Sequence, residues 1–327
     1  MSDTAEEGAR VTTYLGRRLV ATLPVLLLVT LTTFLLVSLL PGDVVSAIQA
    51  ATEGIDVEVA ESLRVQFGLD RPLLVRYLQW LTRLAAGDLG RSLLGHQPVL
   101  GAIVDRFPVT LLLTAGAVVL SLAIGIPVGL AAGLRPNSAF DRVLSALAAV
   151  GVAAPGFWLG ILLVFLFAQR LQWLPSFGYR SPVEFGLGAM AAHMLLPWIT
   201  LATPRTVEVV RQVRSGMAEV MAQEYVRMAR AKGLPEHTVV SRHALRNVLI
   251  PVVTVTGLSA GHLLSGAVIV ETVFLLPGMG TLAVEGVLTR DFPIVQGIVL
   301  VGASATILAN LLADFAYGIL DPRIRYD

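Results

Sequence analysis

The stretch FPVTLLLTAGAVVLSLAIGIPVGLAAGL, residues 107–134, contains no charged side chain. About 20 consecutive apolar residues are enough for a helix to cross the hydrocarbon core of a bilayer. Backbone polar groups find no water there, so a segment of this kind is expected to be a continuous helix. Five more charge-free runs occur, at residues 19–40, 143–169, 185–204, 247–270 and 292–313. The sequence therefore predicts an all-α, polytopic membrane protein with six transmembrane helices.

The composition of the whole chain agrees with this class. The mean hydropathy is +0.75, and 14% of the 327 residues are charged, whereas a soluble protein carries about 25%. The net charge of +1 points to no particular class of partner. Cysteine is absent, which excludes disulfides, thiolate metal sites and a cysteine nucleophile.

The first apolar run has some features of a cleaved signal peptide, because Arg17 and Arg18 precede it. Residues 19–40 are longer than the usual apolar region of a signal peptide, however, and no A-x-A cleavage site follows them. We therefore predict that this run is retained as the first membrane span.

Positive charge is distributed unequally between the segments that connect the predicted spans. The side that holds both termini carries Arg10, Arg17, Arg18, Arg135, Arg142, Arg205, Arg211, Arg214, Arg227, Arg230, Lys232, Arg242, Arg246, Arg323 and Arg325. The short loops of the opposite side carry only Arg170, Arg180 and Arg290. Basic residues concentrate in cytoplasmic loops, so both termini are predicted to be cytoplasmic. The long loop at 41–106 also holds arginines, but long loops are largely exempt from this rule.

These observations predict the topology of the whole chain. The expected transmembrane helices are residues 19–40, 108–134, 143–168, 188–210, 248–271 and 293–317. The cytoplasmic side is expected to hold residues 1–18, 211–247 and 318–327. The outer side is expected to hold a long loop at 41–107, a loop at 169–187 and a segment at 272–292. Pro277, Gly278 and Gly280 interrupt this last segment, which predicts a re-entrant or interfacial element.

The long outer loop contains VEVAESLRVQFGLDRPLLVRYLQWLTRLAAGDLG, residues 57–90, which predicts two short helices. Gly68 and Pro72 separate them, and Gly87 with Asp88 ends the second. An apolar stripe on the second helix is formed by Leu74, Tyr77, Leu78 and Leu81. We expect this stripe to pack on the membrane domain, with a docking platform as the alternative.

Small residues and prolines recur within the predicted spans. Glycines four residues apart, which allow helices to approach closely in lipid, are Gly125, Gly129 and Gly133, and then Gly156 and Gly160. They predict tight packing of the bundle. Kinks are expected at Pro127, Pro155, Pro197 and Pro251.

The predicted cytoplasmic loop contains the basic segment EYVRMARAKGLPEHTVVSRHALRN, residues 224–247. Helical spacing places Met217, Met221, Tyr225 and Met228 on one side of an amphipathic helix expected to run from 217 to 232. Gly233 then suits the left-handed residue after a helix end, and Pro235 suits the first turn of a second helix. The second helix is expected to lead directly into the fifth span.

Three interpretations of this segment compete. It is a connector that lies on anionic headgroups, a nucleic-acid or lipid site, or a docking surface for a cytoplasmic protein. A single lysine and scattered acidic residues argue against the second. Methionine, tyrosine and arginine together favour an adaptable protein contact, but the residues by themselves leave the connector and the docking surface equally supported.

A resemblance decides between them. The segment EYVRMARAKGLPEHTVVSRHALRNVLIP, residues 224–251, resembles the cytoplasmic EAA loop of ABC-importer permeases, in particular the dipeptide and oligopeptide group. Further stretches resemble that group in the same order: FGLDRPLLVRYLQWL, GDLGRSLLGHQPV, APGFWLGILLVF, WLPSFG, ETVFLLPGMGTLAVEGVLTRDFPIVQG and LDPRIRY. One departure concerns the Glu-Ala-Ala of the generic loop, where Arg227, Met228 and Ala229 stand here. The role of that glutamate is therefore not transferred.

The resemblance implies the type I ABC importer permease fold and a place in the bacterial cytoplasmic membrane. It implies a second related permease, two cytoplasmic ABC ATPase domains, an extracytoplasmic solute-binding protein and a di- or oligopeptide substrate, with ATP and Mg²⁺ held on the partner subunits. Nickel chelates, glutathione and other small solutes stay open as substrates. The loop residues implied to couple to the ATPase are Glu224, Tyr225, Arg227, Ala229, Arg230, Lys232, Gly233, Leu234, His243, Arg246 and Asn247.

The chain contains no nucleotide-binding motif of its own. The only lysine, Lys232, follows Ala231, so no phosphate-binding G-x-x-x-x-G-K-[ST] loop exists. No metal-ligand spacing of histidines is present. We therefore predict a transport subunit with no catalytic, cofactor-binding or metal-binding residue, and expect no nucleic acid as a partner.

Few ionisable residues fall within the predicted spans, and such residues are candidates for function. His262 and Glu271 are the predicted residues of the substrate pathway or gate; His193 and Asp314 are weaker candidates. Two alternatives stay open: a gradient-driven secondary transporter, and an intramembrane enzyme built on Ser259, His262 and Ser265. Sparse intramembrane charge argues against the first, and the lack of an activating third group against the second.

Overall fold

The structure is a computed structural model that describes residues 22–35, 38, 45, 57–66, 70–258 and 260–320. The predicted cytoplasmic segment 1–18 and residues 321–327 of the predicted tail lie outside these residues. Every regular element in the described part is helical apart from one isolated bridge between Arg91 and Pro98, which confirms the all-α fold class. The first predicted span contains an apolar helix at Thr22–Leu35.

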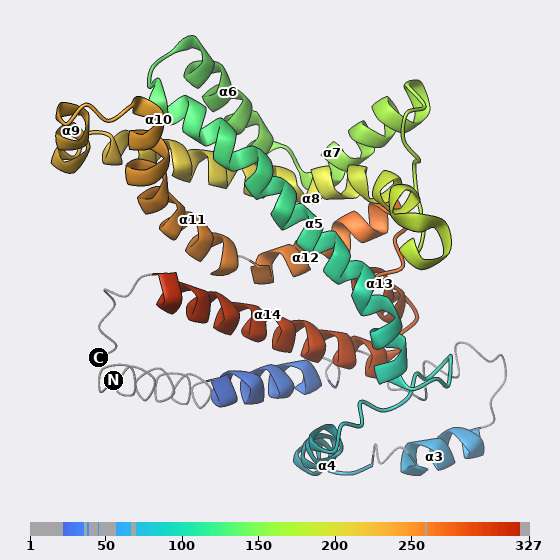
Figure 1. The fold of residues 1–327 in the computed structure, drawn as a ribbon. Helices are drawn as coiled ribbons and strands as arrows, with labels where there is room; N and C mark the ends of the chain where they lie inside the picture. The colour runs from blue at the N-terminus through green and yellow to red at the C-terminus, as the bar shows by residue number, and fades with distance from the viewer. Residues whose placement is uncertain are drawn as a thin grey trace, which may run out of the picture. The chain divides into compact units, whose positions relative to one another are not determined.

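The helices follow one another along the chain as drawn in Figure 1. They are α3 (Val57–Gln66), α4 (Leu73–Ala85), α5 (Val99–Leu134), α6 (Ala139–Ala153), α7 (Gly156–Leu163), the π-helix η1 (Val164–Arg170), α8 (Pro182–Val220), α9 (Glu224–Ala231), α10 (Glu236–Thr238), the π-helix η2 (Val239–Leu245), α11 (Arg246–Leu258), α12 (Ala260–Phe274), α13 (Met279–Leu288) and α14 (Phe292–Leu320). The two predicted helices of the outer loop are α3 and α4, as expected.

Three described helices are long and apolar enough to span a membrane: α5, α8 and α14. The number rises to five if two bent helix pairs each count as one span. One of these pairs joins α6 to α7 and η1. Pro155 stands at its break with φ −61° and ψ 134°, since proline cannot continue a helix from the preceding turn. The count of six spans stays a prediction.

The chain divides into two compact units, which are described separately. The first combines residues 1–108 with 278–307. Its core joins the start of α5 to α13 and α14 through the buried side chains of Val99, Ile103, Leu282 and Ile294. Asp291 is buried and accepts hydrogen bonds from the Ser92 hydroxyl and the Leu93 N–H, which links the loop before α5 to the turn before α14.

The same unit corrects the expectation for the apolar stripe of α4. Tyr77 lies against Phe34 of the Thr22–Leu35 helix, with ring centroids 5.4 Å apart, and its hydroxyl is 2.9 Å from that of Thr30. Leu74 and Leu78 are 69% and 51% exposed, and no residue of α4 is buried. Within the described residues, Tyr77 packs on the Thr22–Leu35 helix, whereas Leu74 and Leu78 of the stripe stay exposed.

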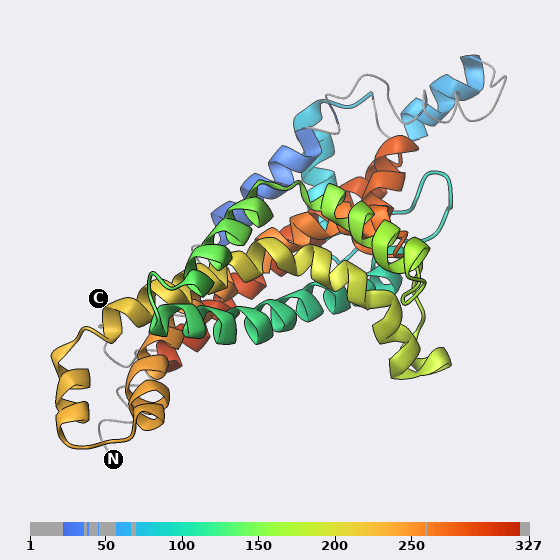
Figure 2. The same ribbon diagram turned by 90° about the horizontal axis from the view of Figure 1, so that it is seen from above.

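The second unit combines residues 109–277 with 308–325 and holds the largest buried cluster. Along α5, the predicted glycine positions Gly125, Gly129 and Gly133 all face α8, and the two helices run side by side in Figure 2. Gly160 of α7 faces Thr200 and Phe274. Gly156 differs from the prediction, because no atom lies within 4 Å of where its Cβ would be.

Candidate coupling surface between α8 and α11

The basic segment forms two short helical arms between α8 and α11, at one end of the second unit in both views (Figures 1 and 2). We call residues 224–247 the coupling hairpin. Only three residues separate the end of α8 at Val220 from the start of α9 at Glu224. The second arm, α10 with η2, continues into α11 with no intervening residue. The hairpin is therefore joined closely along the chain to both α8 and α11.

The single helix predicted over residues 217–232 is wrong, because the structure has two separate helices there. The helical run ends at Val220, and Gln223 adopts an extended conformation with φ −69° and ψ 150° before α9 begins. Met217 is fully buried against α11, whereas Met228 is 59% exposed, so the methionines do not form one face. The two helices are buried in different clusters. Helix α8 packs on α11, whereas α9 packs on η2 through Val226 and Val239.

The turn between the arms is a Schellman motif, which confirms the predicted role of Gly233. The Gly233 N–H donates to the Arg230 carbonyl at 2.9 Å, and the Leu234 N–H donates to the Ala229 carbonyl at 3.4 Å. Gly233 has φ +78°, a left-handed conformation that glycine adopts without steric cost. Pro235 is the N-cap of the second arm and not its first helical residue.

Polar contacts tie the two arms together at both ends. Near the turn, the Arg230 guanidinium donates to both carboxylate oxygens of Glu236, with Nη2–Oε1 2.6 Å and Nε–Oε2 3.1 Å. This hydrogen bond lowers the pKa of Glu236 below its usual value of 4.5. The contribution of the pair to stability is therefore complete above pH 4.5 and lost as the pH falls below it. At the other end, the Asn247 side-chain amide donates to the Tyr225 hydroxyl at 2.8 Å.

The structure brings the predicted coupling residues together on the hairpin, with three different degrees of exposure. Ala229 is buried and belongs to the scaffold, and His243 is half-buried. The others are exposed: Glu224, Tyr225, Arg227, Arg230, Lys232, Gly233, Leu234, Arg246 and Asn247. Neither Glu236 nor Met228 was among the residues predicted to couple to the ATPase. Glu236 holds the turn through Arg230, and Met228 adds apolar surface between charged neighbours.

The predicted pathway residues lie elsewhere. The side chain of His262 is outside the described part of the structure, and so is that of Asp314. Glu271 is fully buried on α12, where Thr110 of α5 donates a hydrogen bond to its Oε1 at 2.6 Å. His193 is half-buried, with Nδ1 2.9 Å from the carbonyl of Ala189 one turn earlier. Glu271 thus connects α12 to α5 across 161 positions of sequence.

Replacing Thr110 by valine is expected to destabilise the protein by about 1–3 kcal/mol, because the buried Glu271 side chain loses the hydrogen bond that Thr110 donates. Thr114→Val is the matched control on the same helix. The Thr114 hydroxyl donates to the backbone carbonyl of Thr110 within α5, so its loss breaks no contact between helices. Thermal unfolding of both variants in detergent measures the difference, and equal unfolding temperatures would contradict the role assigned to Thr110.

Comparisons with known families and proteins support the resemblance that the sequence suggested. Residues 125–326 match the family described as "Binding-protein-dependent transport system inner membrane component", and residues 11–114 match its N-terminal companion. A Brucella abortus protein named as a peptide transport system permease is 43% identical over 97% of this chain and 100% of its own. The dipeptide transport system permease protein DppB of Escherichia coli is 39% identical over 96% of this chain and 98% of its own.

A solved structure shares the fold. A chain of the MetNI methionine ABC transporter, in an inward-facing conformation, superposes with a TM-score of 0.56 at 16% identity and covers 68% of this chain and 97% of its own. The family match spans the coupling hairpin and the helices on either side of it. The resemblance stated from the sequence is thereby confirmed: this chain belongs to the binding-protein-dependent inner membrane components, the permease subunits of ABC importers.

Proposed function

We propose that this permease imports di- or oligopeptides, which an extracytoplasmic solute-binding protein delivers and ATP hydrolysis on separate subunits drives. The observation that carries the proposal is the coupling hairpin, whose basic, apolar and aromatic side chains are exposed on a scaffold joined directly to α8 and α11. The names of the relatives support the peptide class, since peptide transport appears in both quoted above.

The mechanism follows from how the hairpin is attached. A cytoplasmic ATPase that binds its exposed face moves both arms as one body, because Val226, Ala229 and Val239 form a shared core and Arg230 pairs with Glu236. Helices α8 and α11 are themselves packed together through Val213 of α8 and Val248 of α11. Rotation of the hairpin therefore tilts this helix pair. Alternating access requires such an element with two arrangements, one for each side of the membrane.

Partner subunits supply the remaining functions of the transporter. ATP and Mg²⁺ are held by the two ATPase domains, and a second related permease completes the pathway. The outer segments at 41–106 and 273–293 meet the binding protein, with both termini of this chain in the cytoplasm. Exposed Val287 and Leu288 at the end of α13 offer apolar surface for that contact.

Reconstitution tests the proposal. Liposomes that contain this permease, its partner permease and the ATPases are expected to accumulate a labelled dipeptide only with ATP and the binding protein. The control carries an ATPase whose catalytic glutamate is replaced by glutamine, and it is expected to show no uptake. Uptake by this chain alone along an ion gradient would overturn the importer mechanism. ATP-dependent uptake of glutathione or a nickel chelate, with no dipeptide uptake, would overturn only the substrate.

A further inference from the structure

A cavity of about 270 Å³ lies between α6 and α8 in the second unit. Its lining is mostly apolar with two arginines: Leu144, Ser145, Ala148, Ala149, Val207, Val210, Arg211 and Arg214. At about 30 Å³ per water molecule this space holds roughly nine small groups. That is enough for one phosphate and the first carbons of a chain attached to it. Neither the coupling hairpin nor the Glu271 contact includes these residues.

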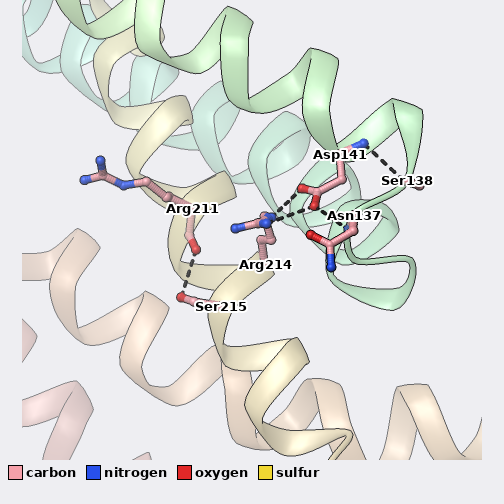
Figure 3. A network of polar contacts seen from close by, with 6 residues as sticks. All are labelled: Asn137, Ser138, Asp141, Arg211, Arg214 and Ser215. Atoms are coloured by element: carbon pink, nitrogen blue, oxygen red, sulfur yellow. Dashed lines mark hydrogen bonds and ion pairs between the residues drawn. The ribbon is translucent and has the colours of Figure 1, made fainter.

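The two arginines are in different electrostatic situations (Figure 3). Arg214 is paired with Asp141 of α6, a buried carboxylate that also accepts the Asn137 N–H at 2.9 Å. In Figure 3 the Arg211 guanidinium extends away from this pair, and only the Arg211 backbone carbonyl has a dashed contact, to Ser215. Within the described residues no acidic side chain pairs with Arg211. The cavity thus has one compensated arginine and one uncompensated arginine.

The predicted topology places the cavity at the headgroup layer of a bilayer. The predicted fourth span ends at residue 210, so Arg211 is the first residue beyond the hydrocarbon core on the side assigned to the cytoplasm. On α6, an exposed apolar stripe at helical spacing is formed by Phe140, Val143, Leu147 and Val150, which are 51–66% exposed. A stripe of this kind suits contact with acyl chains. The cavity is therefore apolar toward the membrane core and cationic toward its surface.

We propose that this cavity binds an anionic phospholipid of the cytoplasmic leaflet, such as phosphatidylglycerol or cardiolipin. The phosphate accepts hydrogen bonds from Arg211, whose planar guanidinium matches phosphate geometry. The first carbons of one acyl chain lie against Leu144, Ala148 and Val207. Basic pockets between transmembrane helices on the cytoplasmic side are a recurring form of lipid recognition. The inference depends on insertion of α6 and α8 in a bilayer and not on which solute is transported.

Lipid retention measures the effect directly. The full-length chain, within its complex, is placed in nanodiscs with equal amounts of phosphatidylglycerol and phosphatidylcholine, then extracted in mild detergent, and its bound lipids are counted by native mass spectrometry. Arg211→Gln is expected to lower the retained phosphatidylglycerol about fivefold relative to phosphatidylcholine. Arg135→Gln is the matched charge control. Arg135 is exposed on the turn before α6 and does not line the cavity.

A second pair of variants changes volume and leaves charge unaltered. Ala148→Phe fills the cavity and is expected to lower retention of both lipids, whereas Ala146→Phe, on the exposed side of the same helix, is not. Equal loss in Arg135→Gln and Arg211→Gln would overturn the proposal, since general surface charge would then explain binding. Unchanged lipid retention together with loss of the partner permease in Ala148→Phe would overturn it too, because the cavity would then be a protein interface.

Discussion

Replacing Gly129 by leucine is expected to prevent the second unit from folding, and Gly129→Ala is expected to destabilise it by about 1–3 kcal/mol. A Cβ at this position would lie 2.8 Å from the Val210 carbonyl oxygen and 2.8 Å from Val213 Cβ. Both belong to α8, and one is backbone, which cannot rotate away. Gly125 and Gly133, one turn to either side, have contacts just as close, so the helices cannot separate at one point alone.

The control for this prediction is on the same helix. No atom lies within 4 Å of where a Cβ on Gly101 would be, and Gly101→Ala is expected to stabilise α5 by at most about 1 kcal/mol through helix propensity. The measurements are membrane yield and thermal unfolding in detergent. If Gly129→Ala and Gly101→Ala unfold at the same temperature, the close approach of α5 and α8 does not stabilise the protein.

Replacing Gly233 by tryptophan is expected to reduce substrate-stimulated ATP hydrolysis and uptake by at least about tenfold while the chain stays in the membrane. A non-glycine residue at φ +78° costs about 1–2 kcal/mol, which distorts the Schellman turn that sets the angle between α9 and η2. No atom lies within 4 Å of the added Cβ, so the indole occupies the exposed face where the ATPase is proposed to bind. Both effects act on coupling and neither on the buried core.

Two controls separate these effects. The Gly233→Asn variant adds only a small side chain, and asparagine tolerates the left-handed conformation. This variant is therefore expected to retain most of the coupling. Gly87→Trp places the same indole on a glycine with φ +81° and no atom within 4 Å, but in the outer loop, and it is expected to leave association with the ATPase intact. Normal uptake and normal stimulated hydrolysis in Gly233→Trp would contradict the coupling role.

Local signals predicted much of the structure. The break at Pro155 and the end of α9 at Gly233 are properties of one residue and its immediate neighbours, so they were readable from the chain. The charge-free run at 107–134 likewise lies wholly within one helix, α5. The helix expected over 217–232 failed for the opposite reason. Its periodicity is real, but Met217 and Val226 are buried in different clusters, and the helix ends at Val220.

Some features of the candidate sites were likewise predictable from the sequence, and others were not. The exposed basic residues of the coupling hairpin were predictable, because a basic segment between apolar spans stands out and its motif is contiguous. The pairing of Arg230 with Glu236 was not predicted, although both residues lie within the segment. Nothing in the sequence around Glu271 indicated Thr110 as its partner, and nothing around Arg211 indicated a cavity shared with α6.

The sequence by itself therefore determined that this protein is a helical membrane permease, and it located the break at Pro155 and the helix end before Gly233. Hydrophobic runs, glycine and proline act on the chain within a turn or two, and their effects need no partner. Only the tertiary structure decided which carboxylates pair, which glycines touch a neighbouring helix and where a cavity opens. Apart from the pair of Arg230 and Glu236, those features join side chains that lie tens to hundreds of positions apart, and packing between helices brings them together without any local pattern.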